Sequence, residues 1–360
     1  MAADTQTQAL FRLGAEELAR MPSGIHGLHR AIARRAFAGS GACARPARVL
    51  HDGISSAVYR GLSGAIAAGG QLAEPALARR FEGLPEAPRG AALIGIVNGL
   101  VGDLLEREGN PVAEPMAVRA RDVPDPPTPR IAVFLHGLFE TERSWRIGGR
   151  EAYGRALARE HGWSALYVRY NSGRAIGANG RDLDALLEEL VAGWPVPVER
   201  IALVGHSMGG LVARCACHEA CERGASWFAL TEDVVSLGAP HHGSPVAVGV
   251  AAAERALRAL PETEGMGSFL GRRSAGVRDL QRGLSDDDYP YPDGPRYRFV
   301  AATLTRDPRH PVGRIVGDWL VRESSACGPD PEQVERIGGA GHFALLNHPQ
   351  VAEHITAWLA

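Results

Sequence analysis

From residue 131 to the end of the chain, short apolar runs alternate with longer segments of helical periodicity. The short runs predict buried strands, because they are rich in β-branched and leucine residues and are bounded by turn-forming residues. Continuous apolar strands alternating with helices are typical of a parallel sheet covered by helices on both faces. We therefore expect a mostly parallel α/β fold in residues 130–360. The expected strands are Ile131–Leu135, Ala165–Tyr170, Ile201–Val204, Val234–Leu237, Arg298–Leu304 and Val334–Ile337, and the expected helices are Ala152–Glu160, Arg181–Ala192 and Ala352–Leu359.

Residues 1–122 have a different pattern, with no convincing strand before about residue 110. Ile25–Phe37 has a helical stripe, and Ile54–Leu72 and Ala91–Leu105 are apolar with many glycines and alanines. Small residues at this density predict closely packed helices, with a lipid-facing surface as the alternative. The proline-rich connector Val123–Pro129 excludes helix and central strand. We place a boundary there, after an N-terminal helical region of unknown role.

Residues 246–295 interrupt the alternation between two expected strands. So long an insertion near the strand ends predicts a helical cap that controls substrate access. Its apolar residues include Phe269 and Leu270, which we expect to contact substrate. A helical layer that serves stability alone is the alternative.

The pentapeptide Gly205–Gly209 reads G-H-S-M-G and lies between an expected strand and a helix-like segment. A strand that turns sharply into a helix exposes the hydroxyl of its central serine, and small flanking residues relieve crowding at the bend. The following helix N-terminus directs backbone N–H groups toward developing negative charge. Ser207 is therefore the candidate nucleophile, and a serine-capped structural turn is the alternative.

A serine hydroxyl needs a nearby base, and the base needs an orienting acid. In sheets of this type the chain order is serine, acid, histidine. His342 lies in a glycine-rich loop after the last expected strand, whereas His218 lies on the helix that leaves Ser207 and cannot fold back onto it. His342 is therefore the candidate base. Asp307 and Asp318 both follow the strand that precedes it and compete as the acid.

Composition excludes several other classes of protein. The net charge of −2 offers no basic surface for nucleic acid. The first residues lack the layout of a secretory signal, and no apolar run is long enough to span a membrane. Five cysteines do not suggest a disulfide framework, so we expect a reduced cytoplasmic protein. Cys217 and Cys221 share a helix face, but buried thiols explain them better than a metal site.

Together these segments resemble the α/β-hydrolase superfamily, and within it bacterial lipases and esterases. The matching segments are Phe134–Leu138, Tyr170–Gly173, Gly205–Gly210, Leu237–Ser244, Gly317–Val321 and Gly341–Phe343. The resemblance implies a triad of Ser207, Asp318 and His342, with no metal or organic cofactor. It also implies an oxyanion hole formed by the backbone N–H groups of Leu138 and Met208.

The resemblance further implies that His136 is structural, and that His241 and His242 shape a loop beside the site. Relatives often carry Gly-Asp-Gly-x-Val where this chain has Trp319 as the third residue, so Asp307 stays open as the acid.

The function expected from these features is hydrolysis of carboxylic esters, as an esterase or lipase, through an acyl-enzyme. Acyl transfer or thioester hydrolysis would use the same residues, and a non-catalytic binding protein on this fold is a further alternative. The expected partner is a small-molecule or lipid ester, without nucleic acid. Contact with a membrane surface through the glycine- and alanine-rich helices is compatible with this function.

Overall fold

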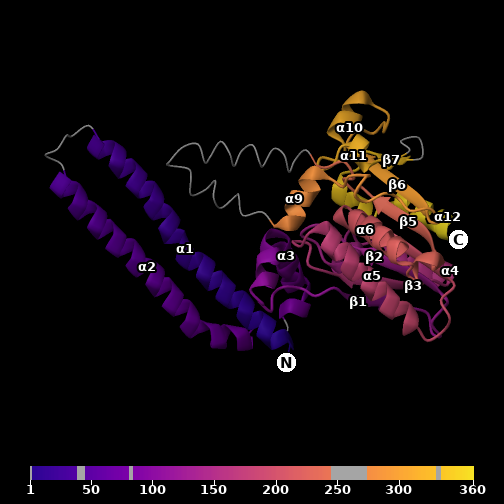
Figure 1. The fold of residues 1–360 in the computed structure, drawn as a ribbon, viewed down its shortest axis with the longest axis horizontal. Coiled ribbons are helices and arrows are strands. Elements are labelled where there is room, and N and C mark those ends of the chain that lie inside the picture. Colours follow the sequence, from indigo (N-terminus) through magenta and orange to yellow (C-terminus); the bar gives the residue numbers. More distant parts are fainter. Residues whose placement is uncertain (1, 39–44, 81–83, 245–273, 330–333) are drawn as a thin grey trace. The chain divides into compact units, whose positions relative to one another are not determined.

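The computed structural model describes residues 2–38, 45–80, 84–244, 274–329 and 334–360 (Figure 1). The chain forms two compact units. The helical unit contains the described residues up to Gly90 together with Asn110–Val112. The sheet unit contains Ala91–Gly109 and the described residues from Ala113 to the C-terminus.

The sheet unit is built on seven strands in the order β1-β3-β2-β4-β5-β6-β7. β1 pairs antiparallel with β3 at one edge, and every other pairing is parallel. The strands run side by side in Figure 1, and β4 is central. Their bounds are β1 Ala117–Asp122, β2 Arg130–Leu135, β3 Ser164–Arg169, β4 Arg200–His206, β5 Thr231–Leu237, β6 Arg296–Thr303 and β7 Val334–Gly338.

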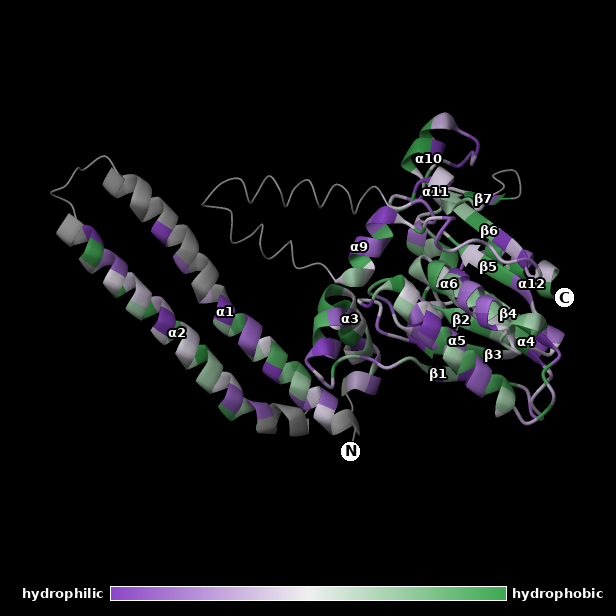
Figure 2. Ribbon diagram, in the orientation of Figure 1, coloured by the Kyte–Doolittle hydropathy of each residue, from purple (hydrophilic) through white to green (hydrophobic). Residues whose placement is uncertain are grey.

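Helices cover both faces of this sheet, as the apolar runs predict. α5 and α6 pack on one face and α4 and α12 on the other. Along β2, Ile131 and Val133 belong to the core that includes α5 and α6, whereas Phe134 belongs to the core that includes α4 and α12. Figure 2 shows the strands as mainly hydrophobic, while α5 carries both hydrophobic and hydrophilic residues. The helices of the sheet unit are α3 Pro88–Arg107, which begins in the helical unit, α4 Tyr153–His161, α5 Ile176–Ala192, α6 Met208–Arg223, α9 Ala275–Arg282, α10 Pro311–Val316, α11 Glu323–Ala326 and α12 Pro349–Leu359.

The strands and helices expected after residue 130 are present, with ends that differ by a few residues. The range 1–122, expected to be helical, also contains the strand β1. Its sequence alternates Arg119 and Arg121 with small apolar residues, which suits an edge strand with one solvated face. The compact units divide at Gly90 rather than at the proline-rich connector.

The helical unit consists mainly of α1 (Ala2–Ala38) and α2 (Arg45–Arg80), which pack against each other. Arg12 donates to Glu74 at 2.9 and 3.1 Å, and the rings of His26 and Tyr59 stack. Gly70 lies directly against Ala15, as close helix packing predicts. Other glycines of α2 face open space among the described residues, so helix packing explains the small residues only in part.

The expected cap, residues 246–295, falls largely outside the described residues, and Phe269 and Leu270 lie there. The described part begins with α9 and continues to β6. Arg214 on α6 holds it by donating to the Tyr289 carbonyl at 2.7 Å and by stacking on the Tyr291 ring at 3.9 Å. This part of the insertion is therefore packed onto the sheet unit.

Among the helices in the described ranges, none is long and apolar enough to cross a membrane.

Candidate active site

Ser207 lies on the turn between β4 and α6, where the sequence places a candidate nucleophile. Its φ of 53° is in the left-handed region, which a non-glycine residue rarely adopts and which is frequent at functional sites. The turn is tight, because a Cβ at Gly209 would lie 2.8 Å from the His136 carbonyl oxygen. The Ser207 N–H donates to the Leu237 carbonyl at 2.8 Å, which ties the turn to the end of β5. Ser207 is 8% exposed.

Asp318 and His342 form a buried pair. His342 Nδ1 lies 2.6 Å from Asp318 Oδ2, and the His342 N–H donates to the Asp318 carbonyl at 3.1 Å. The other carboxylate oxygen, Oδ1, accepts the N–H groups of Leu320 and Val321 at 2.9 and 2.8 Å. Both carboxylate oxygens of Asp318 thus have fixed donors, and the carboxylate orients the imidazole.

Asp307 makes no contact with this pair among the described interactions. Asp307 is exposed, and its carboxylate accepts only the N–H of Arg309, two residues along the same turn, among the interactions of the described chain. Trp319 has a φ of 86°, the backbone region that favours glycine, which is the residue that the family resemblance leads us to expect at this position. The Trp319 side chain is 69% exposed, so the neighbouring residues leave room for it despite this backbone conformation.

The nucleophile turn and the Asp318–His342 pair meet at the carboxyl end of the sheet. A Cβ at Gly238, directly after β5, would lie 3.3 Å from both Asp318 Oδ2 and His342 Nδ1. The ring of His206 lies 4.7 Å from that of His342, and its Nε2 lies 3.2 Å from the His342 carbonyl oxygen. The three residues proposed from sequence as a triad are therefore gathered at one end of the sheet, although they are far apart in the chain.

The loop after β2 lies against Ser207. A Cβ at Gly137 would lie 3.0 Å from Ser207 Cβ. Two backbone N–H groups here donate no hydrogen bond within the described part of the chain. They belong to Leu138, which lies in this loop, and to Met208, which begins α6. Backbone donors of this kind beside a serine hydroxyl can stabilise a developing oxyanion.

Sequence reasoning missed two residues at this site, Glu140 and His206. Glu140 Oε2 accepts the Gly137 N–H at 2.9 Å, and its carboxylate oxygens lie 3.0 and 3.2 Å from His206 Nδ1. Burial favours neutral forms of both groups, but the opposite charges outweigh it, so the pKa of Glu140 is lowered and that of His206 is raised. The only sequence signal was the position of His206 inside the pentapeptide.

His136 and His241 are buried neutral rings. His136 stacks on Tyr170, and burial lowers its pKa. Its Nε2 accepts the Tyr170 N–H at 3.3 Å, and its Nδ1 lies 2.9 Å from the Gly137 carbonyl. Burial also lowers the pKa of His241 to about 3, and its Nδ1 lies 3.1 Å from the Tyr291 hydroxyl. Both rings brace loops beside the site.

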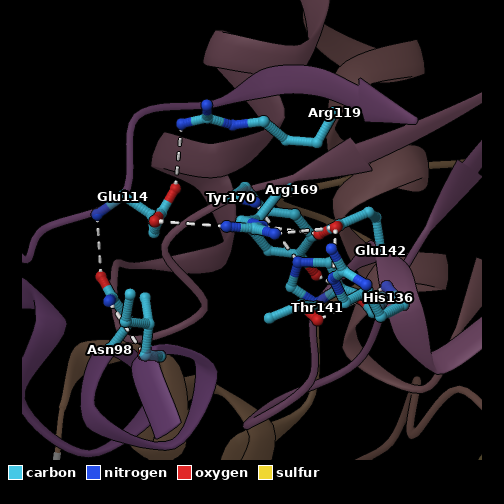
Figure 3. A network of polar contacts seen from close by, with 10 residues as sticks. Asn98, Glu114, Arg119, His136, Thr141, Glu142, Arg169 and Tyr170 are labelled. Carbon is cyan, nitrogen blue, oxygen red and sulfur yellow. Dashed lines mark hydrogen bonds and ion pairs between the residues drawn. The ribbon is translucent and has the colours of Figure 1, made fainter. Parts of the chain in front are cut away.

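A polar network lies behind the loop that follows β2 (Figure 3). Arg169 on β3 donates to Glu142 at 2.6 and 2.7 Å and lies 3.6 Å from Glu114. Burial would raise the pKa of Glu142, but Arg169 outweighs it and the pKa is lowered. Asn98 on α3 accepts the Glu114 N–H at 3.0 Å. The network therefore connects α3 to the loop that carries Leu138.

α3 also touches that loop directly. A Cβ at Gly95 would lie 2.7 Å from the Glu140 carbonyl oxygen and 3.0 Å from that of Phe139, and one at Gly99 would overlap the Phe139 ring. The many glycines and alanines of Ala91–Leu105 predicted close packing, but the partner of these glycines was not predictable. α3 thus supports the site.

Exposed apolar side chains follow both members of the Asp318–His342 pair in the chain. Trp319 and Phe343, which follow the two members of the pair, are 69% and 56% exposed. Leu304 is also exposed, and its Cδ2 would lie 3.9 Å from a Cβ at Gly341, the residue before His342. No group of histidine, cysteine, aspartate and glutamate side chains in the described ranges has the arrangement of a metal site.

Comparison with known proteins agrees with this architecture. A model of the alpha/beta hydrolase family matches residues 132–354, more than half of the chain. Bacillus licheniformis lipase BlEst2 in its propeptide form is 22% identical, with a TM-score of 0.50 over 68% of this chain and 54% of that one. Its mature form is also 22% identical, with a TM-score of 0.47 over 69% of this chain and 99% of that one.

Staphylococcus hyicus lipase is 14% identical, with a TM-score of 0.39 over 67% of this chain and 96% of that one. No curated protein matches the sequence. At these identities the structural likeness concerns the fold alone. With the family match across the sheet unit and a largely parallel sheet covered by helices on both faces, the chain belongs to the alpha/beta hydrolase family.

Proposed function

We propose that this hydrolase cleaves carboxylic esters through a triad of Ser207, His342 and Asp318. The observation that carries the proposal is the 2.6 Å contact between Asp318 and His342, together with the left-handed turn at Ser207 at the same end of the sheet. A carboxylate that accepts from Nδ1 leaves Nε2 free to take a proton from a serine hydroxyl.

The reaction would proceed in two halves. Ser207 Oγ attacks the ester carbonyl carbon while His342 Nε2 takes the hydroxyl proton, and Asp318 stabilises the imidazolium. The N–H groups of Leu138 and Met208 hold the carbonyl oxygen as it becomes negative. His342 then gives its proton to the departing alkoxide. Water, activated by the same imidazole, hydrolyses the acyl-enzyme and restores Ser207.

The substrate we propose is an ester with an apolar group, such as a lipid ester. The exposed Trp319 and Phe343 side chains support this choice, because they offer apolar surface beside the reacting groups. Contact of Phe269 and Leu270 with the acyl group remains part of the proposal, as does a cap over the site.

Labelling with a fluorophosphonate probe tests the proposal. Such a probe phosphonylates an activated serine, so the intact mass of the wild-type protein should increase by one adduct, located on the peptide that contains Ser207. Ser207→Ala should take up no probe. Ser226→Ala, a change at a surface serine that hydrogen-bonds Glu188, is the matched control and should label like wild type. A wild-type protein that stays unlabelled would favour a non-catalytic binding protein instead.

A further inference from the structure

We propose that Glu140 and His206 form a buried carboxylate–imidazolium pair that positions the catalytic segments relative to one another. The pair lies beside the triad without belonging to it. This inference rests on the proposed function for its kinetic consequences, whereas the charge state of the pair is testable without any substrate.

Hydrogen-bond accounting at His206 indicates its charge. The ring is fully buried, with Nδ1 facing the Glu140 carboxylate and Nε2 facing the His342 carbonyl oxygen at 3.2 Å. A carbonyl only accepts, and an ionised carboxylate only accepts. The lowered pKa of Glu140 favours its ionised form, and with an ionised carboxylate both ring nitrogens satisfy their partners only when both carry a proton. The two contacts, together with an ionised Glu140, therefore favour imidazolium at His206.

The groups around His206 favour its positive charge, because two carboxylates, those of Glu140 and Asp318, act on it. Besides Glu140, two titratable groups face His206: the ring of His342, at 4.7 Å, and Asp318. The negative charge of Asp318 favours the protonated form of His206. The other neighbours are the aromatic rings of Trp145 and Phe343.

Around Glu140, the further titratable groups are His136 and Tyr170. His136 is neutral because burial lowers its pKa, and burial keeps Tyr170 protonated by raising its pKa well above the ordinary value.

The pair connects three segments that come from different strands. The Glu140 carboxylate accepts the Gly137 N–H and thereby fixes the loop with the proposed oxyanion donor Leu138. His206 is the residue directly before Ser207, and its Nε2 holds the backbone of His342. A displacement of about 1 Å within such an arrangement can cost about 10²-fold in rate. Glu140 and His206 are thus positioning residues, and their loss should affect kcat more than KM.

Loss of the His206 proton predicts a specific pH dependence. When His206 becomes neutral, it keeps one N–H, so either the contact with Glu140 or that with the His342 carbonyl is lost. Because the pKa of His206 is raised above its ordinary 6.5, the stabilisation is complete below that value and is lost as the pH rises through the raised pKa. Because the pKa of Glu140 is lowered, the stabilisation from its ionised carboxylate is fully present above pH 4.5. That stabilisation is lost only as the pH falls through the lowered pKa. The alkaline decline of kcat should therefore follow His206.

Two substitutions at Glu140 separate charge from hydrogen bonding. In Glu140→Gln the amide oxygen accepts the Gly137 N–H and the amide nitrogen donates to a neutral His206, so all the contacts persist without charge. Glu140→Ala removes them. The matched control is Asp184→Asn, which removes the charge of an equally buried carboxylate that binds Arg223 and Trp227 and contacts no triad residue.

Long-range proton–nitrogen NMR of the imidazole rings reads the charge of His206 directly, with His206→Asn identifying its signals. We expect a doubly protonated ring at pH 7 in wild type and Asp184→Asn, and a neutral ring in Glu140→Gln. We also expect kcat to decline at alkaline pH in wild type and in Asp184→Asn but not in Glu140→Gln. Glu140→Ala should lower kcat by about 10²-fold with little change in KM.

A neutral His206 ring in wild type at pH 7 would overturn the charged pair. An alkaline decline that is unchanged in Glu140→Gln would overturn its kinetic role. If wild type shows the imidazolium signals but neither hydrolyses esters nor takes up the fluorophosphonate, the proposed function fails while the pair itself stands.

Discussion

Replacing Asp318 by asparagine tests the assignment of the triad acid most sharply, because the surrounding hydrogen bonds decide how the amide must lie. Oδ1 accepts two backbone N–H groups, from Leu320 and Val321, whereas Oδ2 has the single contact with His342 Nδ1. The asparagine oxygen should take the site with two donors, which leaves its NH₂ group facing His342. Nδ1 must then accept, so the ring proton moves to Nε2 and blocks proton transfer from Ser207.

The size of the effect follows from these contacts. The opposite amide orientation would lose two hydrogen bonds worth about 1 kcal/mol each, a preference of about 2 kcal/mol or roughly 30-fold for the blocked tautomer. The missing negative charge also destabilises the imidazolium in the transition state. The same substitution in another Ser-His-Asp triad lowers kcat by about 10⁴-fold. We therefore expect kcat to fall by between roughly 30-fold and about 10⁴-fold, closer to the larger value.

The assay is hydrolysis of a chromogenic ester by Asp318→Asn and by Asp307→Asn. Asp307 is exposed and bonds only within its own turn among the described contacts, so its substitution should change stability by no more than about 0.5 kcal/mol and leave the rate nearly unchanged. Thermal unfolding establishes that both variants are folded. A folded Asp318→Asn protein with more than a thirtieth of wild-type kcat, or a larger loss in Asp307→Asn, would refute the reasoning.

Three further predictions concern other parts of the site. His342→Ala should reduce kcat nearly as much as Ser207→Ala, and the double variant should be little worse than either, because residues that act as one unit are not additive; additive losses in ester turnover would contradict this. Gly95→Ala should lower kcat in ester kinetics, since its Cβ would lie 2.7 Å from the Glu140 carbonyl oxygen. Gly61→Ala, where the Cβ meets open space, should instead stabilise α2 by about 0.5–1 kcal/mol in denaturant unfolding. Trp319→Gly should relieve about 1–3 kcal/mol of backbone strain, partly offset by the freedom of glycine in the unfolded chain, and should raise KM for long-chain esters; an unchanged KM would remove Trp319 from the substrate surface.

Sequence patterns predicted β2 and β4 well, because both strands are buried on both faces and each contains a continuous apolar run. The edge strand β1 was missed, since a half-solvated strand of six residues with two arginines gives a weak signal. Ser207 and His342 could be proposed as catalytic residues from the sequence because each lies in a characteristic turn next to an expected strand.

Other features depend on contacts that no local pattern encodes. Glu140 and His206 are 66 positions apart, so their pairing follows only from the parallel order of β2 and β4. The choice between Asp307 and Asp318 likewise depends on how the chain turns after β6. The support of the loop after β2 by α3 was also not predictable, because α3 precedes the sheet in the chain and its glycines suit any close contact.

The central claim is that Ser207 carries out ester cleavage, and a chain-length series of chromogenic esters measured with wild type and Ser207→Ala tests it most directly. We predict that wild type hydrolyses the series with a preference for apolar acyl groups. We also predict that folded Ser207→Ala retains only the residual rate left by binding and the oxyanion hole, about 10³–10⁴-fold over water. Ser207→Ala that keeps more than a few per cent of wild-type kcat/KM while its unfolding transition is unchanged would contradict the account.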